Sequence, residues 1–560
     1  MSKKQATRSQ KALYNTIAGF SEEIADVVVT MIISRLVITG YGSQYNGLTS
    51  SISQFLTCVS LMRAGIGGAT KVALYKPLAE GDYIKVSQVI NQTQKWLNKV
   101  AIAFMIFLVG FSVVYPLWIN TEFDFFFASS LILLTGLTTI VQYFFGLKYK
   151  MLLYADQKQY VVAAMGIVLL IINATLSIIM LNAQLDYRLV KAKGVLVFMI
   201  KPIFYYFYCG KRYHLNSKIQ PDTDLIKQRW DSLGHEVANF VNNNTDVMVL
   251  TVFTSLGMVS VYTVHNYVMG GIRKVVTNFV NGFGAAFGNM YAKNEIDLMH
   301  ENLGIFEIIV FSLASVVYSV TAVMICSFCL IFTQGAKYTG YEVSYYQPLF
   351  AAIIVGAGAF SCFRIPYETV TKAVGHYKQT RNGAFGEAII NIVISVAAVI
   401  KFGLAGVAFG TIVAAIYRTI QFTVYMSKNI LHRSLWKSIK HILVALGIGA
   451  ATYLISLTYM PAPDAIPNYF VWAIYAVITT LIAIALTVAT DFLLFNTDTK
   501  NFMKKGTSIL KGNKHKKKKN RKKSVQQETN ETELEDVDDV IEMISDNLEE
   551  KSMKKEERNF

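Results

Sequence analysis

An apolar segment at residues 262 to 289 carries a row of polar side chains on one helical face. Five small or polar positions follow one another at steps of four, three, four and four residues: Asn266, Gly270, Arg273, Thr277 and Asn281. Lys274 stands beside Arg273. A cation at the centre of a bilayer costs about 2.5 to 3.5 kcal/mol. Two adjacent cations therefore predict a water-filled cavity or an anionic partner.

Other apolar segments of the chain also contain cations. They are Arg35, Arg63, Lys201, Arg364 and Arg418. A cavity lined by Arg and Lys favours an anion, and the planar fork of Arg bonds two phosphate oxygens at once. We therefore expect these residues, with the polar row above, to bind an anionic group such as a phosphate. Snorkelling to the headgroups is the alternative for cations near the ends of a segment, such as Arg35.

A few acidic and amide side chains lie among these cations. Asp26 and Glu23 are in the first apolar segment, and Asp246 and Asn243 are in the seventh. They could pair with the cations, or they could bind a proton or a metal cation for ion coupling.

The composition is that of a membrane protein. The 560 residues are 53% hydrophobic and only 16% charged, and the mean hydropathy is +0.38. A crossing needs about 20 apolar residues. Fourteen segments meet that need: 18–39, 47–69, 97–118, 125–147, 160–181, 190–209, 235–256, 262–289, 304–332, 347–371, 384–401, 404–426, 440–459 and 469–495.

The loops between these segments differ in charge on alternate sides. One set is rich in Lys and Arg, as in 211–234 and 428–437, whereas the other contains only Arg188, Lys191, Lys193, Lys337 and Lys401. The positive-inside rule then places both termini in the cytoplasm of a multi-pass bacterial cell membrane protein.

The first twelve segments look like two copies of a unit of six. Ile-Ile-Asn at 171–173 recurs at 389–391, an offset of 218, and Lys201 and Arg418 stand 217 positions apart. Even-numbered units share one orientation in the membrane. The expected fold is all-α, with two parallel six-helix bundles around a central cavity plus two C-terminal helices. The expected parts are 1–210, the linker 211–234, 235–427, 428–495 and the tail 496–560.

The tail and the missing motifs limit the function further. The basic run at 511–523 would bind anionic membrane lipids. The acidic stretch after it has the pattern of a short amphipathic helix. A solvated chain is the alternative for the whole tail. Cys326 and Cys329 lie in an apolar run without nearby His or charge, as helix packing would require. We find no nucleotide-binding loop, metal motif or catalytic arrangement, so we expect no enzyme, no cofactor and no nucleic-acid partner.

Three stretches carry a resemblance to a known family. They are NTIAGFSEEIADVVVTMIISRLVITGYGSQYNGL at 15–48, RAGIGGA at 63–69 and YKPLAEGD at 75–82. With the six-plus-six repeat and the extra pair of segments, the chain resembles the bacterial polysaccharide-unit flippases of the multidrug/oligosaccharidyl-lipid/polysaccharide exporter superfamily.

The resemblance implies alternating access around a cationic cavity, lined largely by the first, second, seventh and eighth spans. It implies transfer of a lipid-linked oligosaccharide from the inner to the outer leaflet for surface polysaccharide biosynthesis, with a polymerase or glycosyltransferases as partners. The cations and the polar row would then bind its anionic pyrophosphate and sugar. A lipid II flippase, a cation-coupled multidrug exporter and a membrane polysaccharide polymerase or ligase are the alternatives. The short outward loops argue against the last of these.

Overall fold

The first half of the chain folds into helices α1 to α9. The computed structural model describes residues 8–62, 66–119, 123–220, 233–280, 283–336 and 343–505. In the first half the elements are α1 (Arg8–Gly40), α2 (Ser43–Leu56), α3 (Val59–Met62), α4 (Ile66–Glu80), α5 (Tyr83–Trp118), α6 (Phe125–Val141), the π-helix η1 (Gln142–Gly146), α7 (Leu147–Ala155), α8 (Gln159–Asn182) and α9 (Tyr187–Tyr213).

The second half is helical too, and no strand occurs in the described ranges. Its elements are α10 (Leu233–Phe253), α11 (Leu256–Val280), α12 (Phe283–Ala292), α13 (Ile296–Thr333), α14 (Pro348–Phe363), α15 (Ile365–Ala373), α16 (Tyr377–Asn429), α17 (Leu435–Ser456), the 3-10 helix η3 (Pro463–Ala465) and α18 (Tyr469–Leu494).

The predicted fold class is confirmed, since each of the fourteen predicted segments is mainly helical in its described residues. Within the part of the chain that the structure describes, eight helical segments are long and apolar enough to cross a membrane, and one of them, α16, contains two predicted spans. The five predicted spans that do not meet this criterion of length and hydropathy fall on α1, on α2 to α4, and on α9, α10 and α11. These are helices that carry charged and polar side chains, which lowers their hydropathy.

Two predicted spans are broken where we expected continuous helix. In the second span α2 ends at Leu56, and the Thr57 hydroxyl donates to the Ser53 carbonyl at 2.8 Å, a back-bond that competes with helical pairing. In the tenth span α14 ends before Arg364, because Pro366 lacks the N–H that a continuous helix would need. Each break separates two shorter helices.

The eleventh and twelfth spans form the two arms of α16. Gly403 between them has φ 52° and ψ −126°, a conformation that side-chain-bearing residues rarely adopt. The Ser395 hydroxyl on the first arm donates to the Val407 carbonyl on the second at 3.1 Å. The chain therefore reverses at Gly403, as the predicted boundary between 401 and 404 required.

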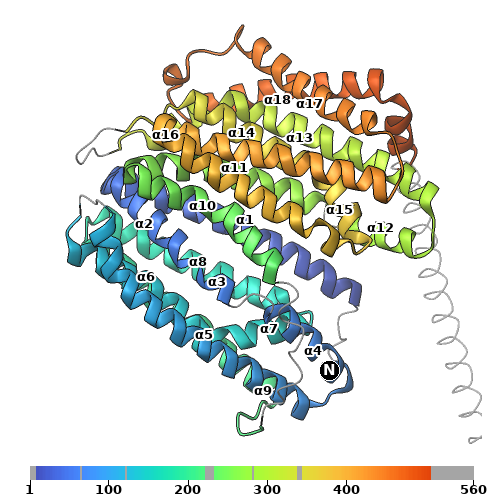
Figure 1. Ribbon diagram of the computed structural model, residues 1–560. Coiled ribbons are helices and arrows are strands. Elements are labelled where there is room, and N and C mark those ends of the chain that lie inside the picture. Colours follow the sequence, from blue (N-terminus) through green and yellow to red (C-terminus); the bar gives the residue numbers. More distant parts are fainter. Residues whose placement is uncertain are drawn as a thin grey trace, which may run out of the picture. The chain divides into compact units, whose positions relative to one another are not determined.

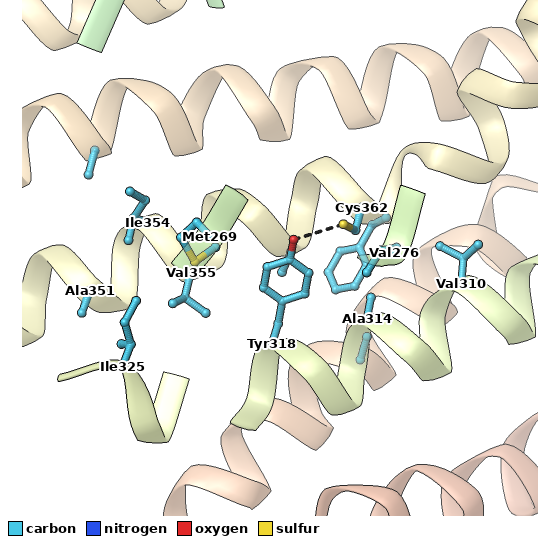
Figure 2. Close-up of a cluster of buried hydrophobic side chains, with 14 of the residues drawn as sticks. Met269, Val276, Val310, Ala314, Tyr318, Ile325, Ala351, Ile354, Val355 and Cys362 are labelled. Atoms are coloured by element: carbon cyan, nitrogen blue, oxygen red, sulfur yellow. Dashed lines mark hydrogen bonds between the residues drawn. The ribbon is translucent and has the colours of Figure 1, made fainter. Parts of the chain in front are cut away.

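Figure 1 shows the blue to teal helices α1–α9 gathered on one side and the green to orange helices α10–α18 on the other. In the first bundle α1 packs on α8 and α5 on α6, and in the second α10 and α14 pack on α16. The core of the second bundle includes Met269, Val276, Tyr318 and Cys362, which point toward one another in Figure 2. Burial of such apolar side chains holds each bundle together.

The bundles meet along α2, which packs against α10 and α11. The approach is close at Gly47, where a Cβ would lie 1.8 Å from the Leu256 carbonyl oxygen. Three buried side-chain hydrogen bonds also join the bundles: Asn46 Nδ2 donates to Ser260 Oγ at 2.8 Å, Thr251 Oγ1 to Ser51 Oγ at 2.9 Å, and the Tyr345 hydroxyl to Ser43 Oγ at 2.8 Å. The bundles are therefore closed together at the end that carries the turns after α1 and α10.

The chain divides into two units, residues 1–490 and residues 491–560. Both bundles, and most of α18, belong to the first unit. The predicted amphipathic segment and basic run of the tail lie outside the described residues.

Candidate functional site

The polar row predicted from the sequence lies on one face of α11. Asn266 and Arg273 are exposed, and Gly270 and Thr277 are half-buried, whereas Met269 and Val276 on an adjoining face are buried in the core of the second bundle. This alternation is the amphipathic pattern of a helix with one packed face and one wet face. The row therefore marks the uncovered side of α11.

Arg273 is the cation of this face that has most contact with solvent. In the part of the chain that the structure describes, no carboxylate oxygen lies within 4.0 Å of its guanidinium. Lys274 beside it is half-buried. The charge of Arg273 acts on the buried carboxylate of Asp246 only from a longer distance, so its guanidinium can offer its donors to an anion.

The wet face of α11 approaches α1 of the other bundle. A Cβ on Gly271 would lie 3.8 Å from Val27 Cγ1, and Asn278 Nδ2 donates to Glu23 Oε2 at 3.2 Å. Asp26, one turn along α1 from Glu23, is exposed. The structure thus places the predicted acids of α1 beside the predicted cations of α11, on facing helices from the two bundles.

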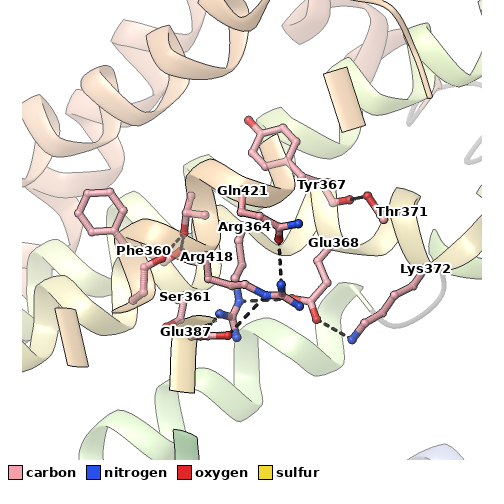
Figure 3. A network of polar contacts seen from close by, with 12 residues as sticks. Phe360, Ser361, Arg364, Tyr367, Glu368, Thr371, Lys372, Glu387, Arg418 and Gln421 are labelled. Atoms are coloured by element: carbon pink, nitrogen blue, oxygen red, sulfur yellow. Dashed lines mark hydrogen bonds and ion pairs between the residues drawn. The ribbon is translucent and has the colours of Figure 1, made fainter. Parts of the chain in front are cut away.

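Arg364 and Arg418 lie together in the second bundle, in the polar network of Figure 3. Arg364 Nη1 donates to Glu387 Oε1 at 2.6 Å, and its Nε lies 3.3 Å from Glu368 Oε2. Arg418 Nε lies 3.4 Å from the other Glu387 oxygen, and its guanidinium stacks on Phe422 with 4.1 Å between guanidinium carbon and ring centroid. Both cations are already neutralised by protein carboxylates.

Arg35 is also held by the protein. Its Nη1 donates to the carbonyls of Ile331 at 2.8 Å and Phe332 at 3.0 Å, in the last turn of α13, and to the Tyr469 hydroxyl at 2.7 Å. The C-terminal carbonyls of a helix attract positive charge. Arg35 therefore links α1 of the first bundle to α13 and α18.

The other predicted site residues are less informative. Lys201 is half-buried in α9, and its charge acts on the carboxylate of Glu22 in α1. Arg63 and Asn281, and the side chain of Asn243, lie outside the described residues. Their predicted roles in anion binding and ion coupling stay predictions.

Asp246 stands in a buried cluster of polar atoms in the second bundle. Its carboxylate accepts from Thr411 Oγ1 at 2.8 Å, from the Tyr262 hydroxyl at 2.9 Å and from Asn391 Nδ2 at 3.4 Å. No described Lys or Arg lies within 4.0 Å of it. The three neighbours are neutral hydrogen-bond donors, two hydroxyls and one amide nitrogen, and a buried carboxylate among neutral groups suits a bound proton or a small hard cation.

Sequence reasoning missed two features of this region. It did not assign Glu387 and Glu368 as partners of the arginines, although Arg364 and Glu368 stand at the helical spacing of four. It counted Lys193 among outward-facing positions, but Lys193 lies within α9 and bonds to Asn173 of α8 at 2.7 Å. The internal repeat could have indicated a role for this asparagine, because Asn173 belongs to the Ile-Ile-Asn motif that recurs in the second half.

Comparison with known proteins identifies the fold. No family model matches the sequence, and no curated protein matches it. Among solved structures, a lipid II flippase, MurJ, in an inward closed conformation matches with a TM-score of 0.61 at 15% identity, over 86% of this chain and 99% of that one. An inward-facing multidrug resistance MATE transporter of the MOP superfamily matches with a TM-score of 0.60 at 13% identity, over 73% of this chain and 96% of that one.

A third match bears on the charge of the binding site. A MOP superfamily transporter from Pyrococcus furiosus, described as having a binding pocket of reverse polarity, matches with a TM-score of 0.53 at 9% identity, over 76% of this chain and 97% of that one. These structural neighbours are flippases and transporters rather than enzymes. The chain therefore has the fold of MOP superfamily membrane transporters.

Proposed function

We propose that the protein is a flippase that moves a polyprenyl pyrophosphate-linked oligosaccharide from the inner to the outer leaflet of a bacterial cell membrane. The product would serve surface polysaccharide biosynthesis. The observation that carries this proposal is Arg273, exposed on the polar face of α11 without a carboxylate partner in the described ranges, where α11 approaches α1.

Arg273 and Lys274 hold the pyrophosphate, with Arg63 and Lys201 on the first bundle. The polar row, Asn266, Thr277 and Asn281, bonds the first sugar. Arg364 and Arg418 contribute differently, because Glu387 and Glu368 already neutralise them. They fix the packing of α14, α15 and α16 that supports α11. The lipid chain stays in the bilayer throughout.

Transfer follows from rocking of the two bundles. The contacts of α2 with α10 and α11 hold the bundles closed at the end that the loop charges assign to the outside. Breaking them would open the binding face outward. Opening of this end would also uncover Leu256 of α11, which packs in the core of the first bundle, and Ile38 of α1, which packs in the core of the second.

The membrane potential supplies the driving force in this proposal. A potential that is negative inside favours outward movement of negative charge by about 2.3 kcal/mol per charge per 100 mV. A headgroup with a charge near −2 therefore gains about 4 to 5 kcal/mol per 100 mV. Ion coupling at Asp246 or Asp26 is then dispensable. We expect Asp26→Asn and Asp246→Asn both to keep transport under an imposed potential. If both variants still bind substrate but lose transport, the membrane potential alone does not drive transfer.

Two alternatives of the same fold differ in substrate. A lipid II flippase is supported by the larger share of the chain that the MurJ structure matches. A multidrug exporter for cationic drugs would need an acidic binding face, and the exposed Arg273 and the half-buried Lys274 argue against it. We rank the polysaccharide-unit substrate first because of the sequence stretches that resemble that family.

The test is leaflet transfer in liposomes. Purified protein is reconstituted with a fluorescent polyprenyl pyrophosphate sugar, and the Arg273→Ala/Lys274→Ala variant is compared with wild type. Loss of charge-assisted bonds predicts at least a tenfold slower transfer and weaker binding. Lys378→Ala/Arg381→Ala, which removes two exposed cations of α16, is the matched control and keeps wild-type transfer. Unchanged transfer in the first variant would refute the assignment of the site, and transfer of lipid II alone would select the alternative substrate.

A further inference from the structure

A second cationic site lies inside the first bundle, apart from the face of α11. A pocket of about 310 Å³ is bounded there by α1, α6, α8 and α9. Two lysines of α9, Lys191 and Lys193, line it together with Asn173 of α8 and with Thr138 and Thr139 of α6. None of these residues has a role in the proposed transfer of the pyrophosphate.

Lys193 has hydrogen bonds but no counter-ion. Its ammonium donates to the backbone and side-chain oxygens of Asn173, both at 2.7 Å, and to the Ser177 hydroxyl. All three acceptors are neutral, and no carboxylate of the described residues lies within 4.0 Å. Lys191 lies over the ring of Tyr187, with 5.3 Å between Nζ and ring centroid. The pocket therefore holds positive charge that its own walls do not neutralise.

The internal repeat gives a second, independent observation. Three pairs of residues stand 218 positions apart: Asn173 and Asn391, Ser177 and Ser395, and Lys193 and Thr411. In the second bundle Asn391 and Thr411 contact the buried carboxylate of Asp246. In the first bundle Asn173, which corresponds to Asn391, contacts Lys193, the residue that stands in the place of Thr411, and Ser177 contacts this lysine as well. The two copies of the unit thus carry equivalent polar clusters of opposite charge.

The walls of the pocket also offer hydrogen-bond donors. The hydroxyls of Thr138 and Thr139 take part in no hydrogen bond within the described part of the chain, whereas Thr135, one turn earlier, donates to the Leu131 carbonyl at 2.7 Å. The amide nitrogen of Asn173 likewise has no acceptor among the described residues. Donors beside an uncompensated cation fit an anion and not a metal ion.

We propose that this pocket binds a small monovalent anion of the chloride class. The anion lies between Lys191 and Lys193, accepts hydrogen bonds from Thr138 and Thr139, and neutralises the lysines. Its counterpart in the second bundle is the carboxylate of Asp246, so the two bundles carry fixed charges of opposite sign at equivalent places. This inference does not depend on the flippase assignment, because anion binding is measured without substrate.

The first test is thermal unfolding of the purified full-length protein. Sodium chloride is compared with sodium gluconate at equal ionic strength, since gluconate is too bulky for tight coordination at a chloride site. Binding to the folded state predicts a Tm about 2 °C higher in chloride. Lys193→Met abolishes the difference, and Lys401→Met, which removes an exposed lysine of α16, keeps it. Equal Tm values for wild type in the two salts, or a difference that persists in Lys193→Met, would overturn the proposal.

A second variant guards against misfolding of Lys193→Met. Thr138→Val/Thr139→Val keeps side-chain shape and both lysines but removes the two donors. Loss of each hydroxyl bond predicts about fivefold weaker binding, read as excess line broadening of chloride-35 in nuclear magnetic resonance titrations. Unaltered broadening in this variant would also reject the site, and competition by pyrophosphate but not by bromide would mean that the pocket takes the substrate headgroup instead.

Discussion

The buried network of Glu387 gives a prediction whose size can be worked from the structure. This carboxylate is bound by two arginines, Arg364 at 2.6 Å and Arg418 at 3.4 Å, and only 10% of its side chain is exposed. Glu387→Ala leaves Arg418, itself 6% exposed, with only neutral partners at Gln421 and the Thr380 carbonyl. Removal of one partner from a buried ion pair typically costs 3 to 5 kcal/mol.

The loss is measurable as a fall in Tm. An unfolding entropy of about 2.1 cal/mol/K per residue makes 1 kcal/mol worth about 0.8 °C for a chain of this size, so we expect a fall of about 3 to 4 °C for Glu387→Ala. The assay is reaction of cysteines with a maleimide dye during heating. It suits this protein because Cys209, Cys326, Cys329 and Cys362 are buried and become reactive only on unfolding.

The matched control removes an ion pair of the same network that lies nearer the surface. Lys372 Nζ is 2.6 Å from Glu368, but its side chain is 47% exposed. Lys372→Ala should therefore lower stability by less than about 1 kcal/mol. If Glu387→Ala lowers Tm no more than Lys372→Ala does, the arginines do not need this carboxylate, and the argument that they are structural fails.

Two further predictions concern the bundle interface and a helix end. In Ser51→Cys/Thr251→Cys the native hydroxyls, 2.9 Å apart, are replaced by thiols that can form a disulfide between α2 and α10. This disulfide should reduce leaflet transfer to background until a reductant restores it. Transfer that continues in the oxidised protein would refute rocking at this interface. The backbone N–H of Lys85 donates to Asp82, the N-cap of α5, and so lowers the pKa of this carboxyl. The stability that the ionised cap contributes is therefore present above the unfolded-state pKa and is lost as pH falls through the lower folded-state pKa. Asp82→Ala should accordingly lower Tm at pH 7 and match wild type at pH values below the folded pKa, and equal Tm values at pH 7 would show that the cap is unimportant.

The sequence alone determined the architecture of this protein. Fourteen apolar segments, alternation of loop charge and a repeat of about 217 residues were enough to predict an all-α transporter-like fold, because a bilayer admits few ways to satisfy the backbone. The polar row on α11 was also readable, since 3.6 residues per turn place Asn266, Gly270, Arg273 and Thr277 on one face.

Only the tertiary structure decided which cations are neutralised. Arg273, Arg364, Arg418 and Arg35 look alike in sequence, but α16 brings Glu387 to two of them and the end of α13 binds the fourth. The partner of Lys193 was also found only in the structure, where the packing of α8 on α9 brings Asn173 to it. The periodicity of the sequence predicts which side chains share one face of a helix. Whether a charge is neutralised depends instead on which other helix lies opposite, and packing between segments far apart in the chain decides that.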